Sequence, residues 1–445
     1  MNIGLVPTLN PSFGGSHQYS LAMLEAAGMI SNNDGDVNTY TLFVQPEESQ
    51  MLQALNVGSR SKVVVCSSSS ERADTFLKSW LGHGVFRGTL SRLRQQVSRR
   101  RLQGPDKIWR GSKFGKWLKE YEIDWALYTV PDFNSFESGV PYVMPIFDLQ
   151  HRLQPEFPEM SADGEWDERE YLFRNGTREA VMILADSEIG KEDILDCYGA
   201  YGITPDRVKV LPYLPATYLS PDVSLSERAR FRSLYRLPER YLLYPAQLWP
   251  HKNHVRLVQA LGLLKDTTKT EVHVVLCGTH SGALRTQVYR DMMREAERLR
   301  VIEQIHYLGY VPNEAMSALY AEAVGLVMPT FFGPTNIPVM EAWLFGCPVM
   351  TSNIRGIREQ VGDAGLLVDP RSVEAIADGM SRLWEDSGLR TELAQRGSRR
   401  VTQYTLQDFT AKLAAIMAEA GQRVSELRIG ECQGRSMGCI PRKIA

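Results

Sequence analysis

Short runs of β-branched and other apolar residues alternate with longer segments of helical period along most of the chain. In the first half the apolar runs cover residues 2–7, 38–44, 61–67, 124–130, 142–148 and 180–187. In the second half they cover residues 240–246, 271–278, 305–311, 323–330, 347–353 and 365–369. Strands that alternate with helices form parallel sheets. The pattern therefore predicts an α/β protein with two largely parallel sheets.

Helical patterns fill the gaps between these runs. They cover residues 17–27, 255–264, 313–322 and 339–345, and the chain reads as helical from Pro370 to about residue 423. The period breaks at residues 208–227, where prolines and serines accumulate. We read this stretch as the boundary between two halves of the chain.

The length of the chain supports a division at that break. A chain of 445 residues exceeds the roughly 250–300 residues at which one hydrophobic core stops growing. We expect a first domain over 1–215, a second over 216–405, a helix over 406–425 that packs back on the first domain, and a disordered tail over 426–445.

Composition narrows the class of protein. A net charge of −2 with 43% hydrophobic and 23% charged residues argues against wholesale nucleic-acid binding. The cysteines form no C-x-x-C pair, the first residues show no signal-peptide pattern, and no run reaches the ~18–20 apolar residues of a membrane span. We expect a cytoplasmic protein that is at most peripheral to a membrane.

Residues 72–119 stand apart, because Lys and Arg far outnumber Asp and Glu there and Trp, Phe and Leu are interspersed. The composition favours a solvated helical insertion that buries its apolar side chains against the first domain. The alternative is a segment that lies on an anionic lipid surface.

Two glycine- or lysine-bearing turns follow predicted strands, where parallel sheets bind ligands. Gly14 and Gly15 open a helix and could turn backbone N–H groups toward an anion or a sugar hydroxyl, unless they form only a tight turn. Lys252 follows the strand 240–246 and is placed to neutralise a diphosphate, unless it is simply solvated. His251 and His254 flank it, but no third ligand is spaced to complete a zinc site.

A third candidate is the loop before the helix 339–345. Its residues, whose amides could point at a phosphate, are Gly333, Pro334, Thr335, Asn336 and Ile337. Glu341 is expected on the first turn of that helix, where a carboxylate would accept hydrogen bonds from ribose hydroxyls or only favour the helix dipole.

Four segments occur in a familiar order: "YPAQLWPHKNHVRLVQAL", "IHYLGYVPNEAMSALYAEAVGLVMPT", "FFGPTNIPVMEAWLFGCPV" and "REQVGDAGLLVDP". Over about 241–405, extended back to about 183, the chain resembles the donor domain of GT-B glycosyltransferases of family 4, the retaining "group 1" enzymes. The resemblance implies two Rossmann-like domains facing across a cleft, with acceptor binding in the first and nucleotide-sugar binding in the second. It also implies chemistry that needs no metal and no other cofactor.

The resemblance assigns roles to single residues of the donor site. Lys252 matches the lysine that contacts the donor diphosphate, and Glu341 matches the glutamate that holds the ribose. Tyr310 and Val311 lie where the backbone frames the base. Thr335, Asn336 and Ile337 lie in the loop whose amides meet the sugar and phosphate, and we add Gly14 and Gly15 to the donor-binding set.

Three positions depart from the family pattern. Gln247 stands where the family has a diphosphate-binding arginine, and Gly333 where it has a first glutamate. In place of His-Asp the chain has Phe147 and Asp148. The stretches "FDLQHRLQPEFPE" and "FFGPTNIP" resemble a subgroup associated with bacterial surface-polysaccharide assembly. Its pattern suggests His151 as the substitute for the missing histidine, with Asp148 and Arg152 as alternatives.

These inferences predict a retaining, metal-independent hexosyltransferase with Lys252, Glu341, His151 and Asp148 at the reaction. Its donor would be a GDP- or UDP-sugar and its acceptor a saccharide or a lipid-linked chain. A binding or scaffolding subunit that has lost turnover is the alternative, because Gln247 and Gly333 both depart from the pattern. An epimerase would need carboxylate pairs that the sequence does not place, and a dinucleotide-dependent oxidoreductase lacks its G-x-G-x-x-G motif.

Overall fold

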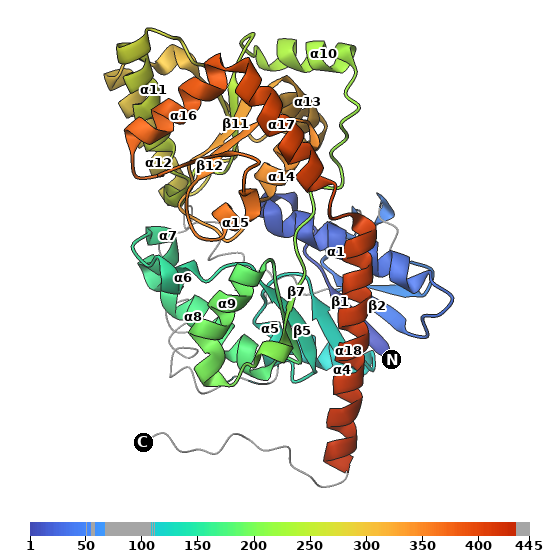
Figure 1. Ribbon diagram of the computed structural model, residues 1–445. Coiled ribbons are helices and arrows are strands. Elements are labelled where there is room, and N and C mark those ends of the chain that lie inside the picture. Colours follow the sequence, from blue (N-terminus) through green and yellow to red (C-terminus); the bar gives the residue numbers. More distant parts are fainter. Residues whose placement is uncertain (50, 55–57, 67–107, 109, 111, 433–445) are drawn as a thin grey trace.

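The chain forms two parallel β-sheets, each with helices packed on it (Figure 1). The computed structural model describes residues 1–445 except 50, 55–57, 67–107, 109, 111 and 433–445. The 7-stranded sheet has the order β3-β2-β1-β4-β5-β6-β7 and the 6-stranded sheet the order β10-β9-β8-β11-β12-β13. The predicted α/β class with two parallel sheets is confirmed.

The first sheet is built from residues 2–210. Its strands are β1 (Asn2–Val6), β2 (Thr39–Val44), β3 (Ser61–Val65), β4 (Trp125–Tyr128), β5 (Tyr142–Ile146), β6 (Met182–Ala185) and β7 (Val208–Val210). Its helices include α1 (Gly15–Ser31), α4 (Lys113–Glu120), α5 (Asn134–Glu137), α6 (Gln150–Leu153), α7 (Pro158–Ser161), α8 (Glu165–Glu179) and α9 (Glu188–Tyr198).

Strand β7 corrects the sequence interpretation. Residues 208–227 were read as a break, yet Val208–Val210 pairs in parallel with β6 and forms the edge of the first sheet. A strand of three residues followed by prolines has too short a period to stand out in the sequence. The irregular part of the connection therefore begins after Val210.

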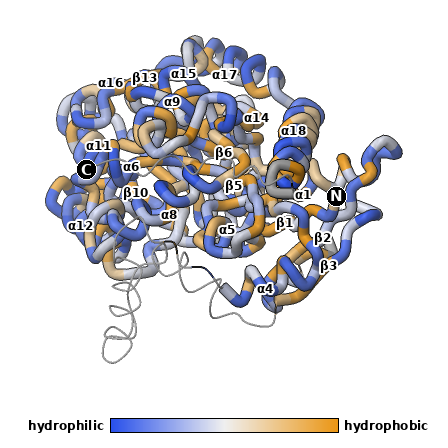
Figure 2. The backbone as a smooth tube through the Cα atoms, turned by 90° about the horizontal axis from the view of Figure 1, so that it is seen from below, coloured by the Kyte–Doolittle hydropathy of each residue, from blue (hydrophilic) through white to orange (hydrophobic). Residues whose placement is uncertain are grey.

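Two hydrophobic cores cover the two faces of the first sheet. Alternate strand residues such as Ile3 and Leu5 pack with α1, whereas Val6 packs with α4, α5, α8 and α9. Hydrophobic residue types accordingly concentrate along the strands, whereas the helices carry both hydrophobic and hydrophilic residues (Figure 2). Gly4 belongs to this packing, since an added Cβ would lie 3.0 Å from Ile123.

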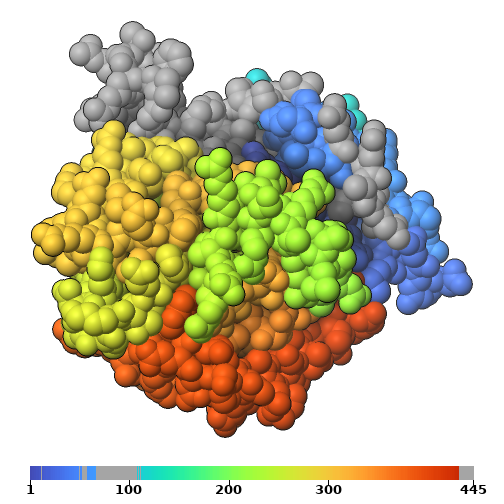
Figure 3. Space-filling model, turned by 90° about the horizontal axis from the view of Figure 1, so that it is seen from above, coloured from blue at the N-terminus to red at the C-terminus, as the bar shows by residue number. Residues whose placement is uncertain are grey.

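The second sheet is built from residues 242–368. Its strands are β8 (Leu242–Pro245), β9 (Val274–Cys277), β10 (Ile305–Gly309), β11 (Gly325–Met328), β12 (Val349–Ser352) and β13 (Leu366–Val368). Its helices are α10 (Leu225–Tyr235), α11 (His254–Thr268), α12 (Ala283–Arg298), α13 (Asn313–Glu322), α14 (Ile337–Leu344), α15 (Ile357–Val361), α16 (Val373–Glu385) and α17 (Ser387–Val401). Seen from above, the light-green residues around α10 and the yellow to orange-red residues that follow them form the surface of this domain (Figure 3).

The last helix returns to the first domain. Helix α18 (Leu406–Cys432) runs beside α1 (Figure 1). Phe409, Leu413 and Val424 are buried in the same core as α1. The helix continues to Cys432, so the expected end at residue 425 and a disordered tail from 426 are wrong for residues 426–432, and residues 433–445 lie outside the described part.

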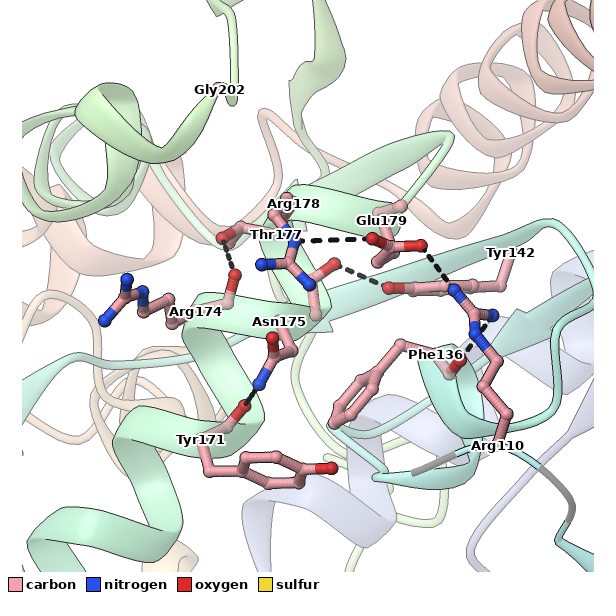
Figure 4. Close-up of polar contacts among 12 residues, drawn as sticks. Arg110, Phe136, Tyr142, Tyr171, Arg174, Asn175, Thr177, Arg178, Glu179 and Gly202 are labelled. Atoms are coloured by element: carbon pink, nitrogen blue, oxygen red, sulfur yellow. Dashed lines mark hydrogen bonds and ion pairs between the residues drawn. The ribbon is translucent and has the colours of Figure 1, made fainter. Parts of the chain in front are cut away.

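Arg110, within the basic stretch 72–119, is tied to the first domain. Its guanidinium donates to the Phe136 carbonyl at 3.1 Å and pairs with Glu179 at 2.7 Å (Figure 4). Nearby, the Tyr142 hydroxyl donates to the Gly176 carbonyl at 2.7 Å, which ties α8 to β5. Most of residues 72–119, and with them the proposed lipid contact, lie outside the described residues.

Candidate donor site at the domain interface

The turn that carries Lys252 is fixed by its backbone. The Tyr244 hydroxyl donates to the Lys252 carbonyl at 2.7 Å. Asn253 adopts φ 64°, and its side-chain amide donates to the carbonyls of Pro329 at 2.9 Å and Pro370 at 2.8 Å. These bonds join the end of β8 to the loops after β11 and β13. The Lys252 side chain therefore starts from a rigid point at the carboxyl edge of the second sheet.

The electrostatic surroundings of Lys252 are mixed. Burial lowers its pKa to about 8, while Asp148 and Glu159 of the first domain favour its charged form. Lys252 thus lies within the electrostatic reach of two carboxylates of the first domain. An ammonium group held in this way is still charged at neutral pH and would interact strongly with a phosphate, because it is partly removed from water.

His251, next to Lys252, bridges the two domains. Its Nδ1 lies 2.6 Å from Glu159 Oε1, and its backbone N–H donates to the same oxygen at 3.0 Å. Its ring stacks on Phe332 with centroids 3.8 Å apart. Burial lowers the pKa of His251 and raises that of Glu159. His251 is therefore a structural contact, and no group of three or more His, Cys, Asp or Glu side chains in the described residues is placed to hold a metal ion.

The loop between β11 and α14 also meets the first domain. The Thr335 hydroxyl donates to Asp186, which follows β6, and Gln150 donates to the Gly333 carbonyl at 3.2 Å. Burial raises the pKa of Asp186 to about 7. An added Cβ at Gly333 would approach the Arg355 carbonyl to 3.1 Å. The backbone is thus packed closely at the position where the resemblance places a glutamate.

Asn336 departs from its predicted role. Its backbone N–H donates to Gln360 Oε1 at 2.9 Å, Gln360 returns a bond to the Asn336 carbonyl at 2.9 Å, and the Asn336 side chain donates to the Phe332 carbonyl at 3.1 Å. In this conformation the Asn336 amide is therefore occupied within the protein. The side chain of Gln360 would have to withdraw before that amide could meet a phosphate.

Glu341 is buried within the second domain. The Tyr320 hydroxyl donates to its Oε2 at 2.6 Å, and burial raises the pKa of Glu341 to about 7. Helix α14 begins at Ile337, so Glu341 is its fifth residue. The expectation from the sequence that Glu341 lies in the first turn is therefore wrong. Glu341 therefore does not stabilise the helix through its dipole, because that interaction is confined to the first turn. The carboxylate remains suited to accept a hydrogen bond from a ligand hydroxyl.

The glycine turn of the first domain faces this loop. An added Cβ at Gly15 would lie 3.2 Å from Ile337 Cδ1. Gly14 adopts φ 56°, which residues with a side chain rarely adopt, and nothing lies within 4 Å of a Cβ built there. The N-termini of α1 and α14, from opposite domains, therefore meet at one place.

Asp148 and His151 lie in different surroundings. Asp148 pairs with Arg169 at 2.5 Å and contributes to the field at Lys252. His151 is 0% exposed, with its Nε2 3.2 Å from the Tyr198 hydroxyl and 3.4 Å from Glu170. A ring enclosed in the first core does not reach a substrate, so the position of His151 contradicts the substrate role expected of it.

Arg152, the alternative in the same loop, is also engaged. It forms two bonds with Glu170 and lies over the Tyr198 ring at 4.7 Å. Arg152 and His151 thus belong to one buried polar group with Glu170. Of the residues considered in this loop, Asp148 is the one whose charge contributes to the field at Lys252.

Tyr310 and Val311, expected to frame the base, and Gln247, which stands in place of the family arginine, follow the strands on either side of β9. Tyr310 follows β10 and is 61% exposed, whereas Val311 is buried. Gln247 follows β8, and its Oε1 accepts hydrogen bonds from Trp249 Nε1 at 3.1 Å and from Arg285 Nη1 at 2.7 Å. These residues and Lys252 share the carboxyl edge of the second sheet.

Sequence reasoning missed Glu159, Asp186, Arg169 and Arg285. Asp186 carried a signal, because it directly follows a predicted strand at the edge where ligands bind. Glu159 lies in the four-residue helix α7 and Arg169 in the longer helix α8, in both cases without a motif. Arg285 lies in a helix whose pattern shows many charged residues, and only its burial distinguishes it.

Comparisons with known proteins agree with this geometry. Residues 226–400 match the family model "Glycosyl transferases group 1". The O-antigen chain mannosyltransferase B of Escherichia coli is 27% identical over 304 residues, which cover 65% of this chain and 74% of that protein. A D-inositol 3-phosphate glycosyltransferase of Corynebacterium glutamicum is 24% identical over 430 residues, 93% of this chain and 94% of that protein.

Solved structures show the same architecture. Anabaena HepE in complex with UDP and glucose has a TM-score of 0.64 at 16% identity and covers 94% of this chain and 99% of its own. WaaG, a glycosyltransferase involved in lipopolysaccharide biosynthesis, has a TM-score of 0.61 at 16% identity with the same coverage. The expected GT-B fold is confirmed, and residues 226–400 are similar to the group 1 glycosyl transferases.

Proposed function

We propose that the chain is a retaining, metal-independent hexosyltransferase of family 4 that uses a GDP- or UDP-linked sugar. The similarity of residues 226–400 to the group 1 glycosyl transferases supports this proposal. Its acceptor is a saccharide or a lipid-linked chain in cell-surface polysaccharide synthesis. The observation that carries the proposal is the position of Lys252. It lies at the carboxyl edge of the donor-domain sheet, within the field of Asp148 from the first domain.

Each residue of the donor site has its own role in the proposed sugar transfer. Lys252 stabilises the negative charge that develops on the leaving diphosphate, and the N-termini of α1 and α14 add their dipoles. Glu341 orients the nucleotide through a ribose hydroxyl, with Tyr320 fixing one of its oxygens. The closely packed loop at Gly333 positions the sugar by its backbone. Transfer on one face of the sugar then requires positioning and charge stabilisation, without a protein nucleophile.

The relatives support the sugar and the pathway. One relative is an O-antigen chain mannosyltransferase, and a structural neighbour forms complexes with UDP and with UDP-glucose. A mannosyl donor carried on GDP and a glucosyl donor carried on UDP are therefore the first two to test.

The test is a thermal melt of the full chain with UDP, GDP, dTDP, ADP, CMP and their sugars. A ligand at 100 times its dissociation constant adds about 2.7 kcal/mol of stability. We expect one nucleotide to raise the melting temperature, Lys252→Ala and Glu341→Ala to abolish the rise, and Lys412→Ala on the exposed side of α18 to leave it unchanged. Absence of a shift with every nucleotide would contradict the proposal.

Two further measurements test the retaining mechanism and the metal independence. Product analysis by NMR should show that the anomeric configuration of the donor is kept, and transfer should survive an excess of EDTA. Inversion of the anomeric configuration would refute the retaining mechanism. Full loss of transfer in EDTA that added Mg²⁺ restores would refute the metal independence.

A binding or scaffolding subunit is the second candidate. It is favoured by the occupation of the Asn336 amide by Gln360. Nucleotide binding without release of nucleoside diphosphate from any donor sugar, with or without acceptor, would support this alternative.

A further inference from the structure

Glu159 has one carboxylate oxygen without a partner at the interface between the domains. The residue lies in α7, on the side of the first domain that faces the second (Figure 1). Its Oε1 accepts two hydrogen bonds from His251, one from the backbone N–H at 3.0 Å and one from Nδ1 at 2.6 Å. Its Oε2 is buried and has no hydrogen-bond partner among the described residues, and only 4% of the side chain is exposed.

The donor domain fixes the orientation of this carboxylate. Two donors on one oxygen of Glu159 hold the group in a single direction. His251 is itself fixed, because its carbonyl accepts from the backbone N–H of Phe331 at 2.8 Å and its ring stacks on Phe332 with centroids 3.8 Å apart. Phe157, which precedes α7, packs against both phenylalanine rings with centroids 5.3 and 5.1 Å away. Oε2 is therefore held in place from both domains, as a ligand-binding group must be.

An enclosed carboxylate oxygen without a donor is unusual in this protein. Taking such an oxygen away from water is unfavourable unless a donor replaces the water, and buried side-chain oxygens nearly always have one. Glu48 follows this rule, since its two oxygens accept from the backbone N–H groups of Leu9 and Gln45. Glu170 follows it as well, with donors on both oxygens. Glu159 therefore differs from these two buried carboxylates by an acceptor that remains available to a ligand.

The neighbours of Glu159 indicate the class of ligand. Lys252 directly follows the histidine that holds Glu159, and the two charges influence each other. A phosphate bound by this lysine would therefore place its sugar close to the carboxylate. Phe332 is followed by Gly333, which has no side chain and where an added Cβ would lie 3.1 Å from a backbone carbonyl. A carboxylate repels a phosphate but accepts hydrogen bonds from neutral hydroxyl groups, so the ligand group at Oε2 is a hydroxyl.

We propose that Glu159 binds a hydroxyl group of the transferred hexose, which donates to Oε2, while His251 acts as a positioning residue on the other oxygen. The first domain thereby supplies a carboxylate to the donor sugar, and the donor domain orients it. Lys252 binds the diphosphate and Glu159 binds the ring attached to it. This inference deepens the proposed function and rests on it, because it needs a nucleotide sugar between the two domains.

The test compares a nucleoside diphosphate with its hexose conjugate. Dissociation constants are measured by calorimetry on the full chain, without acceptor, for the nucleotide that raises the melting temperature. Glu159→Gln keeps the shape and an oxygen for His251 but replaces the charged acceptor with an amide, and Glu156→Gln at the exposed start of this segment is the control. We expect Glu159→Gln to weaken binding of the conjugate roughly tenfold or more and to leave binding of the nucleoside diphosphate within a few fold.

Deoxy analogues of the conjugate identify the hydroxyl. One analogue that lacks the hydroxyl at C2, C3, C4 or C6 should bind the unaltered protein roughly tenfold more weakly than the conjugate does. Glu159→Gln should bind that analogue and the conjugate equally, because the same hydrogen bond cannot be lost twice. Where Glu159→Gln does not fold, Glu159→Asp, which keeps the charge and withdraws it by one methylene, is measured in the same way.

The role of His251 is tested by removing and restoring its donor. His251→Ala should weaken binding of the hexose conjugate more than binding of the nucleoside diphosphate. His251→Asn, whose side-chain amide can donate from near the position of Nδ1, should recover most of the loss. Equal binding of the conjugate by His251→Ala and the unaltered protein would refute the role of His251.

The outcomes separate this inference from the proposed function. Loss confined to the conjugate and to one hydroxyl supports the proposal. Equal weakening of the nucleoside diphosphate and its conjugate, or a loss that no deoxy analogue reproduces, overturns it, because either result describes a structural role. Unchanged donor binding with a raised KM for the acceptor also overturns it, since the hydroxyl then belongs to the acceptor. If the unaltered protein binds none of the nucleotides or conjugates, the proposed function is refuted and this inference with it. If it binds a conjugate and Glu159→Gln binds that conjugate equally well, the donor site stands and only the role of Glu159 is refuted.

Discussion

Replacing Glu341 with Gln should stabilise the protein increasingly as pH rises. Glu341 is buried, and burial raises its pKa from 4.5 to about 7. The folded protein therefore holds this proton more tightly than the unfolded chain does. Stability from the neutral carboxyl is fully present below pH 4.5, declines as pH rises through the interval between the two pKa values, and is lost above about 7.

The size of the effect follows from the same two values. A tenfold change in proton affinity corresponds to about 1.4 kcal/mol, so a pKa that moves from 4.5 to about 7 corresponds to about 3 kcal/mol. Gln keeps the shape of the side chain and a carbonyl oxygen that can accept from Tyr320. We expect Glu341→Gln to match the unaltered protein near pH 4 and to exceed its unfolding free energy by about 3 kcal/mol near pH 8.

The assay is urea unfolding of both proteins at several pH values between 4 and 8.5, with Glu314→Gln at the surface of α13 as the control. The difference between the two curves isolates Glu341 from every other group that titrates. A difference that does not change with pH would refute the reasoning. It would mean that the carboxylate is ionised in the folded protein across this range and that Tyr320 and its surroundings compensate for its burial.

Three other predictions address the charge and packing around the site. Because burial lowers the pKa of Lys252 to about 8, the affinity of the protein for a nucleoside diphosphate should fall as pH rises from 7 to 9.5. Lys252→Arg should make this affinity less dependent on pH, and the same pH dependence in the variant and in the unaltered protein would contradict the prediction. Gly397→Ala should destabilise the protein by about 1–3 kcal/mol, because its Cβ would overlap Trp343 Cδ1 at 2.1 Å; chemical denaturation, with Gly388→Ala as the control, measures this. Phe409→Ala should cost about 3–5 kcal/mol, since Phe409 is fully buried beside Tyr19; equal stability of the variant would show that α18 is not part of the first core.

Much of the fold could be predicted from the sequence because it depends on local periodicity. Each strand expected in residues 2–187 and 240–369 is present, since buried parallel strands read as continuous apolar runs. The helices that follow the first and eighth strands were also expected, though each extends beyond its predicted limits. Strand β7 was missed because three residues leave no measurable period.

The candidate site could be predicted only in part. The sequence alone placed Lys252, Gly14 and the loop at Gly333 at strand ends, and the strand-end rule brings such residues to the ligand-binding edges of their sheets. It could not show that His151 is enclosed by Glu170 and Tyr198, because a histidine in a short helix has the same pattern whether it faces the core or a substrate.

The tertiary structure alone decided which distant side chains meet. Glu159 reaches His251, Asp186 reaches Thr335, and Arg285 reaches Gln247, over separations along the chain of 92, 149 and 38 residues. Local sequence carries the period of an element, whereas burial and pKa depend on everything packed around a group from other elements. The positions of the elements and of their ligand-binding ends could therefore be predicted from the sequence. The surroundings of the charged groups of Glu341, Lys252 and Arg285 are set only by the packing of helices and domains around them.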